Sequence, residues 1–198
     1  MPRSEPPEKR EQPTVAFASR TAWKTWLAKH HDTSSGVWLK IAKRGRPVST
    51  VTYADALEVA LSYGWIDGQK NKLDDDYWLQ RFCPRAARSR WSKINCAKAL
   101  DLIETGEMRP AGLREVERAK ADGRWDAAYD GQRTIVVPSD LQDALDRNAK
   151  ARKFFATLDS ANRYAILYRI HDAKRPETRA RRIEQYVAML SEQKKLHP

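Results

Sequence analysis

The stretch Tyr63-Gly64-Trp65-Ile66-Asp67-Gly68-Gln69 decides the fold, together with Tyr77-Trp78-Leu79-Gln80-Arg81-Phe82 a few positions later. Both stretches contain aromatic residues, and the first also contains Ile66; such side chains favour strands, so we predict strands over residues 65–69 and 77–82. The polar residues 70–76 between them form a connection too long for a tight two-residue turn. The two stretches therefore predict an antiparallel hairpin with a wide loop.

Residues 36–41 (Gly-Val-Trp-Leu-Lys-Ile) predict another strand, because their aliphatic side chains alternate. A helix is predicted between this strand and the hairpin. It begins at a capping box of Thr52 and Asp55, and it ends at Gly64, where a left-handed residue is needed.

The first 18 residues are predicted to be a disordered tail. They are mostly polar and charged, so they cannot bury enough apolar surface to offset the entropy cost of ordering. Ser19 then caps a short helix with Trp23, Trp26 and Leu27 on one face.

From residue 92 onward the apolar spacing becomes helical. Ser92 is predicted to cap a helix whose inner face holds Cys96, Ala99, Leu100 and Ile103. Later helices are predicted to start at a capping box beginning with Ser139, at Asp159 and at Pro176.

These elements predict an α+β fold. Three or four antiparallel strands, flanked by helices, form an aromatic-rich domain over residues 19–133, packed with a C-terminal all-helical bundle over residues 134–198.

Composition limits the function classes. The net charge of +11 favours anionic partners but does not determine a fold. The two cysteines, Cys83 and Cys96, are too few for a disulfide framework and indicate ordinary thiols in a reducing compartment. No apolar run reaches the length of a membrane span or a signal peptide, so we predict a cytoplasmic protein without membrane insertion.

The most unusual candidate site residues are Trp65, Asp67 and Gln69, which share one strand face. Asp67, between two glycines and beside an indole, could orient a polar ligand with Gln69 as a hydrogen-bonding partner. The alternative is structural: Asp67 pairs with a nearby arginine and Trp65 fills the core.

A basic segment, residues 81–95, begins at the end of the predicted hairpin and enters a helix. Its candidate residues are Arg81, Arg85, Trp91, Lys93 and Asn95. Arginines before a helix N-terminus suit phosphate or carboxylate binding. The alternative is a solvated basic loop. If a site exists, we expect a groove between this segment and the 65–69 strand, with Trp65 and Trp91 stacking on the ligand.

No catalytic residue, metal ligand or cofactor is predicted. The four histidines lack partners at metal-ligand spacing, and the acidic residues 74–76 lack the pattern of a calcium loop. No phosphate loop, dinucleotide motif or nucleophile elbow is present, so no reaction is assigned.

Several short motifs occur in a fixed order along the chain. They are Trp23-Lys24-Thr25-Trp26-Leu27, Gly36-Val37-Trp38-Leu39, Gly64-Trp65-Ile66-Asp67-Gly68-Gln69, Gln80-Arg81-Phe82, Trp91-Ser92-Lys93, Met108-Arg109-Pro110-Ala111-Gly112-Leu113 and Pro176-Glu177-Thr178-Arg179. In order and spacing, they resemble the YdeI/OmpD-associated, or bacteriocin-protection, family over residues 20–192.

The resemblance implies a link to resistance against bacteriocins and cationic antimicrobial peptides, and to outer-membrane porins. It implies no established enzymatic activity. A chain of charge +11 is not expected to sequester cationic peptides itself, because like charges repel. We therefore expect a non-catalytic binding protein in stress resistance. A small anionic ligand and a protein partner stay open as partner classes, as does nucleic acid, which has weaker support because no nucleic-acid-binding motif occurs.

Overall fold

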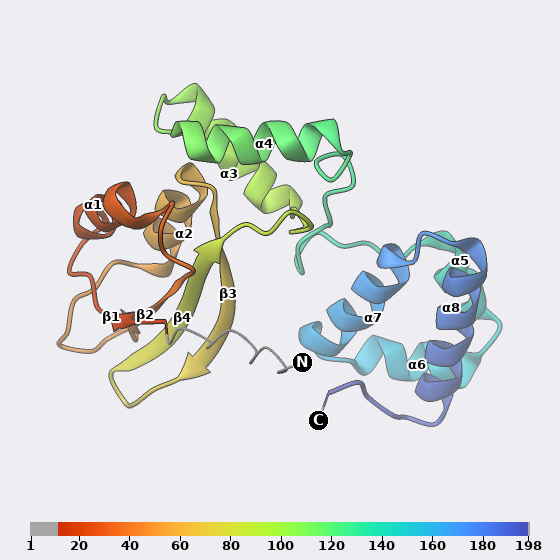
Figure 1. The fold of residues 1–198 in the computed structure, drawn as a ribbon. Helices are drawn as coiled ribbons and strands as arrows, with labels where there is room; N and C mark the ends of the chain where they lie inside the picture. Colours follow the sequence, from red (N-terminus) through yellow and green to blue (C-terminus); the bar gives the residue numbers. More distant parts are fainter. Residues whose placement is uncertain (1–11, 198) are drawn as a thin grey trace, which may run out of the picture. The chain divides into compact units, whose positions relative to one another are not determined.

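The computed structural model describes residues 12–197, which form two units (Figure 1). Unit 1 comprises the described residues up to Ser89 together with Asn95–Asp126, and unit 2 comprises Arg90–Ile94 and the described residues from Ala127 onward. The sheet lies in unit 1, and unit 2 is built of helices. The predicted α+β class is therefore confirmed, while the predicted boundary at residue 133 stays a prediction.

The sheet has four strands in the order β1-β2-β4-β3. Strands β2 (Val37–Ala42), β4 (Tyr77–Pro84) and β3 (Trp65–Lys72) pair antiparallel, as predicted. β3 is longer than predicted and contains a bulge between Asp67 and Lys70, so the connecting loop is correspondingly shorter. The sheet is mixed, because β1 (Thr14–Val15) pairs parallel with β2.

Part of the predicted tail belongs to unit 1. Residues 1–11 lie outside the described part of the chain. Thr14 and Val15 form β1, and Phe17 is buried, with its ring 5.1 Å from that of Trp23. A two-residue strand has no visible periodicity, so the sequence pattern gives no signal for it.

Helices α1 (Arg20–His30) and α2 (Tyr53–Ser62) lie on one side of the sheet (Figure 1). Trp23 of α1 is fully buried against Phe82 of β4 and Trp65 of β3. The predicted caps are confirmed, since the side-chain oxygens of Ser19 and Thr52 accept hydrogen bonds from backbone N–H groups in the first turns.

Helix α3 (Lys93–Glu104) exposes part of the face predicted to be buried. Leu100 is 48 % and Ile103 is 37 % exposed. The buried face instead consists of Asn95, Cys96, Ala99 and Leu102. The predicted and observed faces both have helical spacing and share two residues, so spacing alone did not identify the buried one.

Helix α4 (Pro110–Ala121) packs on α2 through two glycines. Gly112 lies against the carbonyl groups of Leu61 and Ser62. Gly64, just after α2, lies against the carbonyl of Ala111. The backbones therefore approach each other with no room for a side chain at either glycine.

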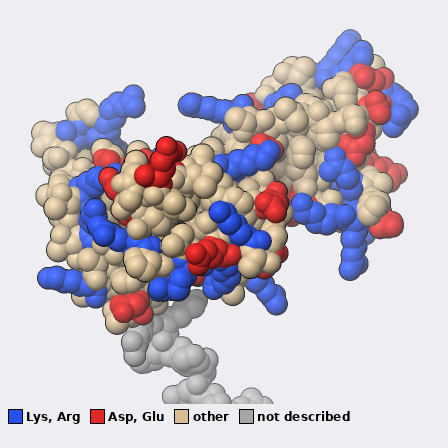
Figure 2. All heavy atoms as spheres, turned by 90° about the horizontal axis from the view of Figure 1, so that it is seen from above, with Lys and Arg blue, Asp and Glu red and all other residues tan. Residues whose placement is uncertain are grey.

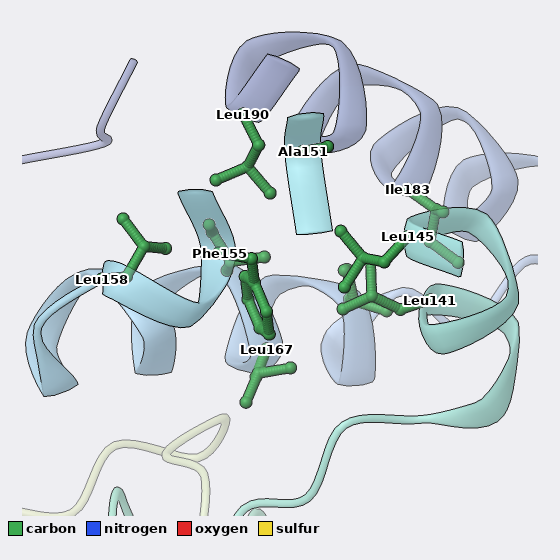
Figure 3. Close-up of a cluster of buried hydrophobic side chains, with 10 residues drawn as sticks. Leu141, Leu145, Ala151, Phe155, Leu158, Leu167, Ile183 and Leu190 are labelled. Atoms are coloured by element: carbon green, nitrogen blue, oxygen red, sulfur yellow. The ribbon is translucent and has the colours of Figure 1, made fainter. Parts of the chain in front are cut away.

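Unit 2 contains α5 (Ser139–Asp146), α6 (Ala149–Thr157), α7 (Ser160–Asp172) and α8 (Pro176–Ser191). Aliphatic side chains from all four helices surround Phe155 (Figure 3). The Asp159 cap is confirmed by its hydrogen bond from the backbone N–H of Asn162 at 2.8 Å. The predicted capping box at Ser139 is wrong, because Ser139 is the first helical residue and Pro138 occupies the cap position.

No helix within residues 12–197 is both long enough and apolar enough to cross a membrane.

Arg179 joins three helices of unit 2. Its Nε and Nη2 bind the carboxylate of Asp140 on α5, and its Nη1 donates to the carbonyl of Ile170 on α7 at 2.9 Å. This bidentate pair holds the pKa of Asp140 below its usual value, mainly through the side-chain hydrogen bonds from Arg179.

We expect Asp140→Asn to destabilise unit 2 at neutral pH and to matter less in acid. A carboxyl with a lowered folded pKa stabilises the protein above its unfolded pKa, and this contribution is lost as the pH falls through the folded pKa. The difference in melting temperature from wild type should therefore shrink between about pH 5 and about pH 2. Scanning calorimetry would measure it, and a difference independent of pH would contradict this account.

Candidate functional site

The three predicted site residues of β3 lie in different environments. Trp65 is 1 % exposed, and its Nε1 donates to the carbonyl of His31 at 2.9 Å. Asp67 accepts a hydrogen bond from the hydroxyl of Tyr53 at 2.8 Å rather than pairing with an arginine in the described contacts. Gln69 is exposed beside the bulge. Trp65 is thus a core residue, whereas Asp67 and Gln69 reach the surface.

The two arginines predicted for the site belong to unit 1. Arg81 donates from Nε to Oε1 of Gln12 at 2.7 Å. Arg85 is 5 % exposed, and its backbone N–H donates to the carbonyl of Gly64. Its charge acts on Cys83 and Cys96, but burial outweighs this effect and raises the pKa of both thiols. Both thiols are therefore protonated and weakly nucleophilic at neutral pH.

The remaining predicted residues are divided between the units. Asn95 is buried in unit 1. Trp91 and Lys93 belong to unit 2, where Trp91 is buried and Lys93 Nζ pairs with Asp130 at 2.8 Å. The predicted groove combines residues of two units, so it stays a prediction as a single site.

Unit 1 contains a different concave surface, which the sequence analysis missed. It lies around Trp78, near the start of β4 and beside the loop after β2, and we call it the Trp78 basin. Trp78 pairs with Ile41 of β2 on one side and with Lys72 of β3 on the other, so three strands meet at its base.

The basin consists of two hollows. The first, the basic hollow, has a volume of about 600 Å³. It is lined by Ala42, Lys43, Arg44, Lys70, Asn71, Lys72 and Trp78. The second has a volume of about 420 Å³, and we call it the neutral hollow because Arg44, shared with the first, is the one charged residue among its described lining residues. It is lined by Ile41, Ala42, Arg44, Val48, Ser49, Thr50, Val51, Thr52, Tyr53 and Trp78.

The register of the strands explains the basic hollow. Lys70 and Lys72 lie on β3, two residues apart and therefore on the same face. Lys43 and Arg44 follow the end of β2, which is bonded to the far side of β4. The backbone N–H of Lys43 donates to the carbonyl of Asp76 at 2.7 Å, which holds this loop against the hairpin.

The electrostatics of the basin are one-sided. Among residues 12–197, no aspartate or glutamate lines either hollow. Lys43 Nζ donates to the backbone carbonyl of Asp74 at 2.6 Å, and Lys70 Nζ lies 4.3 Å from the ring centroid of Trp78. Neither contact neutralises the ammonium charge, so both cations contribute to a positive field in the hollow.

Other basic side chains are more dispersed. On the face in Figure 2, Lys and Arg are scattered and interspersed with Asp and Glu. Several basic side chains outside the basin form ion pairs, for example Arg20 with Glu58 and Glu107, and Lys98 with Glu58. The basin differs because its cations have no carboxylate among its lining residues.

Aromatic contacts fix the wall between the hollows. The rings of Tyr53 and Trp78 lie 5.9 Å apart, tilted by 46°. The hydrogen bond from Tyr53 to Asp67 restrains the tyrosine. Asp67, a predicted site residue, thus positions one wall of the basin. The sequence feature that could have revealed the basin is the pair of basic stretches, residues 43–44 and 70–72, which flank predicted strands.

The described residues 12–197 contain no group of three histidine, cysteine or acidic side chains able to hold a metal ion.

Two family models match the chain. One, a domain of unknown function (DUF8412), matches residues 15–115 and so includes the whole Trp78 basin. The other, described as bacteriocin-protection, YdeI or OmpD-associated, matches residues 134–193, whereas the motif resemblance extended over residues 20–192. No curated protein matches the chain, and no solved structure does. The chain therefore belongs to the family of this domain of unknown function, whose model spans just over half of its 198 residues, and its C-terminal segment is of the YdeI/OmpD-associated, bacteriocin-protection type.

Proposed function

We propose that this protein is a non-catalytic binding protein that holds a small anionic ligand, of the phosphorylated kind, in the Trp78 basin. The observation that carries the proposal is the basic hollow, in which Lys43, Arg44, Lys70 and Lys72 meet beside an indole without a lining carboxylate. An anion is the natural counterpart of such a surface.

Two of these cations are available to a ligand. Within the described chain, the side chains of Arg44 and Lys72 make neither a hydrogen bond nor an ion pair, and both residues are exposed. Arg44 can bind two oxygens of a phosphate or carboxylate at once, whereas Lys72 acts as a point charge. Because Arg44 lines both hollows, it can contact a ligand bound in either one.

The side chains that line the basin favour ligand binding without catalysis. Lysines and hydroxyls can take part in catalysis, but a serine or threonine nucleophile needs an adjacent base, and general acid–base catalysis most often uses imidazoles or carboxylates. No histidine, carboxylate or thiol lines the two hollows among residues 12–197, so their hydroxyls lack such a base there. The hydroxyl of Thr50 already accepts a hydrogen bond from the backbone N–H of Ala42 at 2.9 Å.

The family description supports a role in protection against bacteriocins. We place this role in the cytoplasm, and the free thiols of Cys83 and Cys96 support a reducing compartment. The protein would then act through its ligand and not by sequestering cationic peptides. Survival of host cells under bacteriocin challenge should fall on deletion of the protein and should be restored by wild type but not by a basin variant.

We expect substitution of the basin lysines by glutamate to weaken anion binding specifically. In the double variant Lys70→Glu/Lys72→Glu, the affinity for inorganic pyrophosphate should fall at least about tenfold, because two charge-assisted contacts become repulsive. Isothermal titration calorimetry of the full chain at fixed moderate salt measures this loss.

Lys150→Glu/Lys153→Glu is the matched control, since both lysines are exposed on α6 of unit 2 and lie far along the chain from the basin. It changes the net charge without altering the basin, so it should bind pyrophosphate like wild type. Equal loss in the control would show only a general charge effect. Lys93→Ala tests the groove predicted from sequence: if it abolishes binding while the double variant does not, the ligand binds in that groove and not in the basin.

A further inference from the structure

We propose that the ligand of the Trp78 basin is a nucleotide, with its phosphates in the basic hollow and its base in the neutral hollow. This inference rests on the proposed function and specifies its ligand class. It follows from the different chemistry of two hollows that share one tryptophan.

The hollows are close enough for one ligand to occupy both. Ala42, Arg44 and Trp78 line each of them. With volumes of about 600 and 420 Å³, both lie in the size range of small-molecule sites. A ligand confined to the basic hollow would leave the second hollow unused, whereas a ligand with a charged end and an uncharged ring would fill both.

The walls of the neutral hollow suit a flat ring. Ile41, Val48 and Val51 provide aliphatic contact, and the aromatic rings of Tyr53 and Trp78 provide π faces or edges. Planar bases pack favourably on such side chains and do so with little dependence on base identity.

Three of the four hydroxyl side chains that line the neutral hollow, those of Thr50, Thr52 and Tyr53, are hydrogen-bonded within the protein. Thr50 and Tyr53 use their hydroxyls within the protein, with Ala42 and Asp67 respectively. Ser49 is exposed and makes no side-chain hydrogen bond with another described residue, so its hydroxyl can meet a polar edge of the ring. A densely hydroxylated sugar without a base would find few partners for its hydroxyl groups.

The basic hollow suits more than one phosphate group. It offers four cationic side chains on two separate segments, 43–44 and 70–72. A single phosphate, with at most two negative charges, cannot neutralise four cations. A chain of two or three phosphates carries more charge and spans a longer distance, so a nucleoside di- or triphosphate matches the four cations better than a nucleoside monophosphate does.

The two parts of the basin should contribute separately to affinity. ADP should bind at least about tenfold more tightly than inorganic pyrophosphate, and also than adenosine, because stacking of a base adds to the charge-assisted contacts. Calorimetric titration of the full chain with these three compounds tests this. In Trp78→Ala, the advantage of ADP over pyrophosphate should disappear, while binding of pyrophosphate stays within about threefold of wild type.

Trp78→Phe keeps an aromatic ring and serves as a second variant, in case alanine disturbs the sheet. It should retain most of the advantage of ADP. If pyrophosphate binds wild type as tightly as ADP does, the nucleotide inference fails but the anion-binding function stands. If neither compound binds, both fail.

Short single-stranded oligonucleotides form the last arm of the experiment. The phosphate and base chemistry is the same, but the affinity of a strand falls steeply with salt concentration. If an oligonucleotide binds much more tightly than ADP and loses this advantage at high salt, the ligand is a nucleic acid and not a free nucleotide. Tighter binding of ADP, with modest salt dependence, supports the proposal.

Discussion

Trp23→Ala should lower the free energy of unfolding of unit 1 by about 3–5 kcal/mol, the usual range for a buried aromatic replaced by alanine. Trp23 is fully buried at the junction of α1 and the sheet. Four aromatic rings surround it. They belong to Phe17, Trp26, Trp65 and Phe82, with centroids 5.1 to 6.3 Å from its own.

Two effects add in this substitution. Removing the indole leaves a cavity that the surrounding rings cannot easily fill, because they are held by their own contacts. The Nε1 of Trp23 also donates to the carbonyl of Ala56 at 3.0 Å, so that buried acceptor loses its partner. Since small domains have only about 5–15 kcal/mol of net stability, the variant should be close to unfolding.

Urea unfolding followed by far-ultraviolet circular dichroism measures the loss, without relying on tryptophan fluorescence. Trp26→Ala is the matched control, because Trp26 lies on the same helix and stacks on Trp23 at 5.3 Å but is only half-buried. Trp26→Ala should lower the free energy of unfolding clearly less than Trp23→Ala does. A smaller loss for Trp23→Ala than for Trp26→Ala would contradict the assignment of Trp23 to the centre of the core.

Local signals in the sequence predicted most of the fold. The caps at Ser19, Thr52 and Asp159 were correct because each depends on one side chain and the backbone three residues later. The three antiparallel strands were correct because alternating aliphatic residues mark β2 and aromatic residues mark β3 and β4. Strand β1 was missed because its position depends on pairing with a distant strand rather than on its own two residues.

The candidate site was harder to predict, because it depends on which tryptophans are buried. Trp65 and Trp91 were chosen for their unusual neighbours, yet they are 1 % and 2 % exposed. Trp78 lies in the same hairpin as Trp65, near the loop end of that hairpin, and is partly exposed. Sequence patterns place Trp65 and Trp78 on strands and Trp91 just before a helix, but they do not show how far the covering helices extend. How far the helices cover the sheet depends on tertiary packing, and this coverage decides which tryptophan is accessible to a ligand.

Gly64→Ala should destabilise unit 1 by about 3 kcal/mol, through two separate effects. Gly64 follows α2 with a φ of 75°, in the left-handed region, where an alanine costs about 1–2 kcal/mol. A Cβ at this position would also lie 2.9 Å from the carbonyl oxygen of Ala111 and 3.0 Å from Cγ of Glu115. This overlap would force α4 away from α2, and overpacking of this kind costs typically about 1–3 kcal/mol.

Gly123→Ala separates the two effects. Gly123 occupies the equivalent position after α4, with a φ of 78°, and a Cβ there would meet no described atom within 4 Å. In both variants the unfolded chain loses similar backbone freedom, so that contribution cancels in the comparison. Gly123→Ala should therefore show the left-handed strain alone, about 1–2 kcal/mol, and the excess for Gly64→Ala in urea unfolding measures the packing of α4 on α2. Equal losses for the two variants would mean that α4 moves away from α2 at little cost, and that the close contact at Gly64 contributes little to the stability of unit 1.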